Sequence, residues 1–162
     1  DTGFTVVLSN VDNNSVYPVE QVEGSSTVVL RLKIGTELGI SGTAQGKIVL
    51  AFGHPDLLER VIEEGKMIAH TSDSIVNPQK LRREIKLVRA RGWATAQGER
   101  RIGLDALAVP VFDKAGELTA TLAFLGMINE IPTPPLPHHL AALTSGADKI
   151  TKILPRPKAL TK

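Results

Sequence analysis

The chain has 162 residues, of which 42% are hydrophobic, a length and composition that suit one globular domain with its own core. It contains no cysteine, which excludes a disulfide framework, a thiolate zinc site and a cysteine nucleophile. Its 19 basic and 17 acidic residues nearly balance, so the charge gives no sign of nucleic-acid binding, and no apolar run approaches the roughly 20 residues that span a bilayer. We expect a soluble, cytoplasmic domain without a membrane contact.

The N-terminal part of the chain predicts three β-strands. Two β-rich runs within residues 4–24 flank residues 12–15, whose Asp-Asn-Asn-Ser composition is typical of a turn, so this segment is expected to form a hairpin. The apolar run at residues 26–35 predicts a third strand. The chain should therefore begin with an antiparallel meander.

Two short helices are predicted next, at residues 42–52 and 54–65. Pro55 suits the first helical position of the second helix, and Gly65 suits its end. The buried side of that helix is expected to consist of Leu57, Leu58, Val61 and Ile62.

The strongest helix signal lies at residues 77–92. Asn77 is a favourable N-cap, Pro78 suits the first turn, and Gly92 follows the last helical residue. Helical spacing predicts a buried stripe made of Leu81, Ile85 and Val88.

Strand signals return after Gly92. Residues 92–99 lead to two apolar runs, 104–113 and 117–126, joined by an Asp-Lys-Ala-Gly turn, which predicts a second hairpin. Pro110 cannot donate to a ladder and indicates an edge position or a bulge. After a Pro-rich link, helical spacing predicts a last helix containing Leu140, Leu143, Ala147, Ile150 and Leu154. This order of elements predicts an α+β domain, an antiparallel sheet with helices packed against it.

Several of these segments resemble, in order and spacing, the effector-binding domain of IclR-type bacterial transcription regulators. They include the Gly-Lys-x-x-Leu-Ala helix start at residues 46–51, the Arg-x-x-Gly-aromatic junction at residues 89–93, and the Ala-x-Pro-Val-Phe-Asp-x-x-Gly hairpin at residues 108–116. The resemblance covers nearly the whole chain. It implies a GAF-like fold, an antiparallel sheet of about six strands flanked by helices, with a pocket for a small molecule.

The resemblance also implies a domain organisation. Residues 1–154 would form the effector-binding domain and residues 155–162 a flexible tail. The N-terminal winged helix-turn-helix, through which such regulators read DNA, is absent from this chain. The chain is then either a piece of a longer regulator or an independently encoded sensor, and we expect it to self-associate as a dimer or tetramer.

The helix start near Gly46 and Lys47 is the first candidate site. A phosphate-binding P-loop would need glycine at Ser41 and a hydroxyl at Ile48, so that motif is excluded. A helix start nevertheless offers free N–H groups to an anion. The resemblance implies that this turn lines one wall of the effector pocket, here Thr43, Ala44, Gln45 and Gly46. Lys47 is interpreted as a solvated or carbonyl-pairing residue on the exposed helix face.

The second hairpin supplies the opposite wall in domains of this type. Relatives that hold small keto acids have polar side chains there, whereas this chain has Ala106, Ala123 and Leu125, beside Leu104, with Gln97 as the nearby polar candidate. Such a wall favours a larger, more apolar effector, for example an aromatic acid. The alternative is a ligand-free structural dimerisation domain.

Other polar residues favour structural roles. No nucleophile, base and acid form a set, so no enzyme is predicted, and no cofactor or metal site is expected. His138 and His139 suit a surface pair at a helix start, and Asp105 is interpreted as a paired structural carboxylate. Trp93 is expected to pack in the core or at an interface. Residues 99–101 and the basic face of the helix at residues 77–92 are interpreted as solvated charges.

Overall fold

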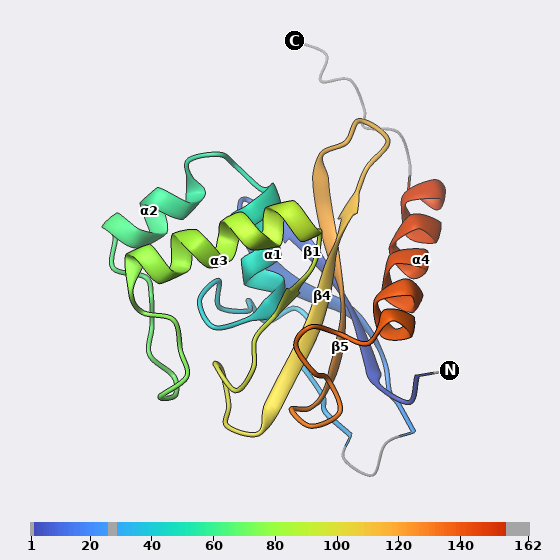
Figure 1. Ribbon diagram of the computed structural model, residues 1–162. Helices are drawn as coiled ribbons and strands as arrows, with labels where there is room; N and C mark the ends of the chain where they lie inside the picture. The colour runs from blue at the N-terminus through green and yellow to red at the C-terminus, as the bar shows by residue number, and fades with distance from the viewer. Residues whose placement is uncertain (1, 26–28, 155–162) are drawn as a thin grey trace.

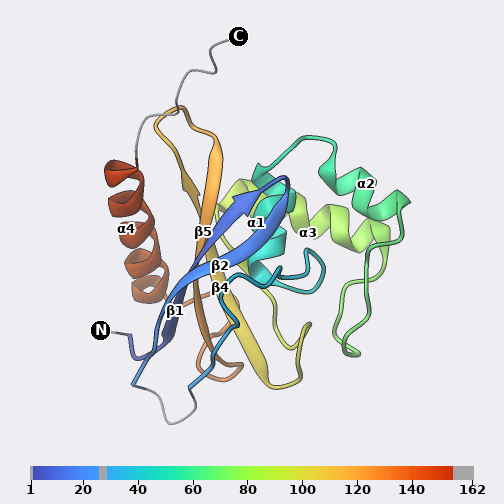
Figure 2. The same ribbon diagram turned by 180° about the vertical axis from the view of Figure 1, so that it is seen from behind.

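The computed structural model describes residues 2–25 and 29–154. Its centre is an antiparallel sheet with the strand order β2-β1-β5-β4-β3. One face of the sheet is covered by α1 and α3, with α2 further out, and the other face by α4 (Figures 1 and 2). This arrangement confirms the predicted α+β class.

The first predicted hairpin is confirmed. Strand β1 (Thr5–Asp12) pairs with β2 (Ser15–Val22), and Asn13 and Asn14 turn between them with positive φ angles. Asparagine tolerates this left-handed region better than most residues, which explains the tight connection.

The predicted third strand at residues 26–35 is wrong for the residues that the structure describes, and residues 26–28 lie outside them. Residues 29–33 form no ladder with a strand. Instead, the amides of Leu32, Gly35 and Leu38 donate single hydrogen bonds to β2, to the Gln21 side chain and the Pro18 and Val16 carbonyls. The described part of the sheet therefore has five strands rather than about six, and this segment runs along the edge of the sheet without extending it.

The three predicted helices after this segment are present. Helix α1 (Ala44–Phe52) begins at the N-cap Thr43, whose hydroxyl accepts a hydrogen bond from the amide of Gly46. Helix α2 (Leu57–Glu63) begins two residues after Pro55, and it buries Leu57 and Val61 fully but Leu58 and Ile62 only in part. Helix α2 is therefore shorter at its start than predicted, and fewer of its side chains are fully buried than predicted.

Helix α3 (Pro78–Arg91) agrees with its prediction at both ends. Asn77 caps the amide of Lys80, and Gly92 ends the helix in the left-handed conformation. The predicted stripe is the buried one: Leu81, Ile85 and Val88. These side chains join α1 and α2 in one hydrophobic cluster on their face of the sheet.

The second hairpin forms the centre of the sheet. After the short β3 (Ala94–Thr95), strands β4 (Leu104–Phe112) and β5 (Leu118–Met127) pair along their length. Strand β3 pairs only with Leu107 and Ala108, so Pro110 lies where β4 has a free edge, as its missing N–H requires.

The last helix, α4 (Pro137–Ile153), covers the opposite face of the sheet. Leu143 and Ala147 are buried in a second hydrophobic cluster with Leu107 and Phe124, while Leu140, Ile150 and Leu154 pack against it. The predicted tail at residues 155–162 lies outside the described residues. Among the described helices, none is long and apolar enough to cross a membrane.

Candidate functional site

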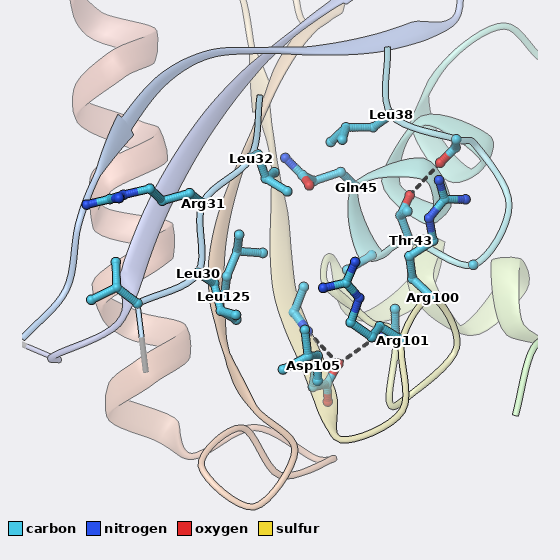
Figure 3. A pocket seen from close by; sticks show the side chains of 17 residues that line it. Leu30, Arg31, Leu32, Leu38, Thr43, Gln45, Arg100, Arg101, Asp105 and Leu125 are labelled. Carbon is cyan, nitrogen blue, oxygen red and sulfur yellow. Dashed lines mark hydrogen bonds between the residues drawn. The ribbon is translucent and has the colours of Figure 1, made fainter. Parts of the chain in front are cut away.

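A cavity of about 430 Å³ opens between the start of α1 and the second hairpin. Its apolar lining comes from three places: the segment after β2 with Val29, Leu30, Leu32 and Leu38, then Ala44 of α1, and finally Leu104, Ala106 and Leu125 of the hairpin. Its polar lining comprises the side chains of Thr43, Gln45, Asp105 and three arginines, Arg31, Arg100 and Arg101, and these surround the space in Figure 3.

The structure brings together six of the nine residues predicted to bind a ligand. Thr43, Ala44, Gln45, Leu104, Ala106 and Leu125 all line the cavity. The other three do not belong to this lining: Gly46 faces the chain at Ile40, Gln97 is exposed, and Ala123 is fully buried beneath α1. A Cβ atom on Gly46 would lie 2.2 Å from the Ile40 carbonyl oxygen, so the glycine serves close packing of the preceding loop.

The first turn of α1 presents two backbone donors at the cavity. Thr43 satisfies the amide of Gly46, and its own carbonyl accepts from Lys47. The amides of Ala44 and Gln45 have no acceptor among the described residues. The Gln45 side chain is held in place because its Nε2 donates to Ser9 Oγ at 2.6 Å. Free N–H groups at a helix start are where proteins commonly receive anions.

Lys47 does not lie on an exposed face, and the prediction of a solvated lysine is wrong. The residue is 4% exposed. Its ammonium group pairs with the buried Glu99 carboxylate, donates to the Thr95 carbonyl at 2.8 Å, and lies 3.6 Å from Glu84. Carbonyl pairing does occur, but in the interior, because position 47 points between α3 and the loop before β4 rather than to solvent. Burial raises the pKa of Glu99, and the Lys47 charge opposes this effect.

The loop carrying Arg100 and Arg101 is fixed from two sides. On one side, the Lys47 ammonium group of α1 pairs with the Glu99 side chain. From the other side, the Ser74 hydroxyl donates to the Glu99 carbonyl at 2.7 Å and the Thr71 hydroxyl to the Gly98 carbonyl at 2.8 Å. Helix α1, the loop between α2 and α3 and the loop before β4 are therefore joined by hydrogen bonds at the wall of the cavity.

The three arginines of the cavity differ in their partners. Arg31 pairs with Glu23 and points away from the space, and Arg100 contacts the His70 ring and extends toward Thr43. The Arg101 guanidinium lies between Gln45 and Asp105 in Figure 3. Sequence reasoning missed this role for Arg100 and Arg101 because a loop position does not reveal which space a side chain enters.

Asp105 is buried but has no arginine partner among the described residues. Its Oδ1 accepts from the amides of Ala96 and Ala106, at 2.9 and 2.6 Å, while Oδ2 lacks a partner within the described part of the chain. The interpretation as a structural carboxylate agrees with these two bonds, but the partners are backbone amides rather than a charged side chain. Burial raises the pKa of Asp105 to about 6, although the hydrogen bonds from the two amides lower it in part.

The remaining polar predictions have mixed outcomes. His139 is buried against Phe4, with ring centroids 4.9 Å apart, so the predicted surface pair holds only for the exposed His138. Trp93 packs partly in the core beneath the Arg91 guanidinium. On the basic face of α3, Arg82 pairs with the exposed Glu59 rather than standing alone. The described residues contain no group of three or more His, Asp or Glu side chains arranged for a metal ion.

Comparison with known proteins identifies the class. The domain family described as the C-terminal domain of the bacterial transcriptional regulator IclR matches residues 1–152, and the chain belongs to this family. The HTH-type transcriptional regulator RhmR of Escherichia coli is 33% identical over 132 residues, which are 80% of this chain and 51% of that protein. BhcR of Paracoccus denitrificans is 30% identical over 77% of this chain and 45% of its own length.

Solved structures agree with this assignment. The Thermotoga maritima IclR structure is similar with a TM-score of 0.84 and 28% identity, over 93% of this chain and 61% of that one. The C-terminal domain of Escherichia coli KdgR has a TM-score of 0.77 and 26% identity, over 93% and 87% of the two chains. The chain spans about half the length of the curated relatives it matches. It is a regulator domain and not an enzyme, as its sequence predicts.

The raised pKa of Asp105 gives a prediction about pH. The folded state binds this proton more tightly than the unfolded state, so the stabilisation is complete below about pH 3.8 and is lost as the pH rises to about 6. The Asp105→Asn variant keeps the Oδ1 acceptor but does not ionise. Its stability relative to the parent protein should increase by about 2 kcal/mol between pH 4 and pH 7. Urea unfolding at several pH values measures this difference, and a difference that stays constant would contradict the account.

Proposed function

We propose that this domain, residues 1–154, senses a small organic acid for an IclR-type transcriptional regulator. The observation that carries the proposal is the cavity, which joins an apolar wall to a helix start with two free backbone donors. The ligand's carboxylate lies at the amides of Ala44 and Gln45, and its apolar body lies against Leu104, Ala106 and Leu125. An aromatic or short aliphatic acid suits a space of this size.

The regulatory consequence rests on family membership. The relatives are named as helix-turn-helix regulators, and each extends well beyond the part that this chain matches. In our proposal a winged helix-turn-helix that precedes this domain binds DNA, and ligand binding here changes that affinity. The nearly balanced charge of this chain supports a division of labour in which the domain does not itself read DNA.

Isothermal titration calorimetry with benzoate, phenylacetate and hexanoate tests the proposal. Ala44 is the first helical residue, where proline is tolerated, so Ala44→Pro removes one donor without breaking the helix. Loss of a hydrogen bond to a charged group should weaken the affinity for the acid that binds by about 10-fold or more. The control Ala44→Val adds bulk at the same position but keeps its N–H.

The outcomes separate the alternatives. Equal affinity in the parent protein and Ala44→Pro contradicts the placement of the carboxylate, and an equal loss in Ala44→Val shows that bulk is responsible. If none of the acids binds, the ligand-free dimerisation domain becomes the better account of the chain.

Self-association is part of the same proposal. Strand β2 lies at an edge of the sheet, and Val19 and Val22 on it are 47% and 64% exposed. Residues 32–38 already donate hydrogen bonds to this edge, so the exposed valine side chains, rather than a free backbone edge, favour contact with a second copy. Two-fold regulators also read two-fold operators. We predict a dimer or tetramer in sedimentation velocity at micromolar concentration. A single species with the mass of one chain, 17.4 kDa, would reject this part of the proposal.

A further inference from the structure

The charged groups around the cavity differ in whether they already have a partner of opposite charge. Glu23 is paired with Arg31 and Glu99 with Lys47, so neither acid is available to neutralise a further cation. Asp105 accepts two backbone amides at Oδ1, while Oδ2 has no partner in the described part of the chain, which leaves one carboxylate against Arg100 and Arg101 in the lining. The cavity is left with an excess of positive charge from its arginines.

Two of the three arginines are also engaged. The Arg31 guanidinium makes two hydrogen bonds to Glu23 on the outer surface. Arg100 is held by the His70 ring, and one of its terminal nitrogens would lie 3.1 Å from a Cβ atom on Gly39, so it is packed closely against that loop. Neither arginine is free to turn toward a ligand without losing these contacts.

Arg101 differs from both. Among the described residues it has no hydrogen-bond acceptor and no acidic partner, and it lines the cavity from a loop that Lys47, Thr71 and Ser74 hold in place. Gln45, the second residue of α1, lines the same cavity, and its backbone amide is one of the two free donors; in Figure 3 the Arg101 guanidinium is seen between the side chains of Gln45 and Asp105. Leu30, Leu32 and Leu125 form the apolar side of the same space.

We propose that Arg101 is the residue that selects the ligand by charge, so that the cavity takes an acid with an apolar body and rejects its neutral amide. This inference rests on the proposed function and adds to it the group that distinguishes an acid from its amide. Backbone amides accept a carboxylate or a neutral carbonyl oxygen alike, whereas a guanidinium favours the carboxylate through a charge-assisted, bidentate pair. The amides of the helix start orient the polar group of the ligand, and Arg101 selects a charged group over a neutral one.

Matched pairs of probes test this inference: benzoate with benzamide, phenylacetate with phenylacetamide, and hexanoate with hexanamide. In the parent domain the acid of a pair should bind at least about 10-fold more tightly than its amide, as a charge-assisted hydrogen bond provides. In Arg101→Gln this preference should fall to less than about threefold. Arg101→Lys should retain part of it, because the charge remains but the bidentate geometry is lost.

Arg82→Gln is the matched control, since it removes an arginine of α3 that is paired with Glu59 and does not line the cavity, and it should leave the preference unchanged. The preference should also decrease as salt is raised, because the Arg101 site is open to solvent. A preference that survives Arg101→Gln, or that Arg82→Gln reduces equally, overturns the inference while leaving the proposed function intact. If neither acids nor amides bind, the proposed function fails and the inference fails with it.

Discussion

The buried pair between Lys47 and Glu99 is the interaction on which the cavity depends. Both side chains are almost fully buried, and the transfer of either charge from water without the other would be strongly unfavourable. Lys47 belongs to α1 and Glu99 to the loop before β4, and Lys47 also reaches the end of β3 through the Thr95 carbonyl. The pair therefore joins the helix that starts at the cavity to the loop that carries its arginines.

Hydrogen bonds next to this pair fix the backbone of the arginine loop. With its side chain held by Lys47, Glu99 presents its carbonyl to Ser74, and the adjacent Gly98 presents its carbonyl to Thr71. The next two residues, Arg100 and Arg101, follow this anchor and line the cavity, where both side chains remain exposed to solvent. A site on a loop gains in this way the rigidity that sites on helices and strands usually have.

The sequence predicted those elements well whose structure depends on residues close together in the chain. Helix α3 is the best case, because an N-cap, an early proline, a spaced apolar stripe and a terminal glycine all act within 16 residues. The third strand was predicted wrongly since β-propensity describes a half-buried extended chain but does not supply a partner strand. Residues 29–33 belong to no strand, and among them the Leu32 amide alone is shown bonded to β2, through the Gln21 side chain.

The site was predictable only in part, for a similar reason. The wall at Thr43, Ala44 and Gln45 follows from a helix start, which is local. The burial of Lys47 depends on Glu99, 52 positions later in the chain, and on the packing of α3 against α1, so an isolated lysine in a helix gave no indication of it. The same distance in sequence hid the role of Arg101.

Hydrogen exchange tests most directly whether this buried pair holds the arginine loop. The amides of Gly98, Glu99 and Leu104 are hydrogen-bonded within or next to that loop, and those of α4 lie on the other face of the sheet. The double variant Lys47→Met with Glu99→Gln removes the pair without leaving a buried charge alone. The account predicts that the three loop amides exchange at least about 10-fold faster, a change of about 1.4 kcal/mol in the local opening free energy, with α4 unchanged. Equal exchange in the variant and the parent protein would contradict it.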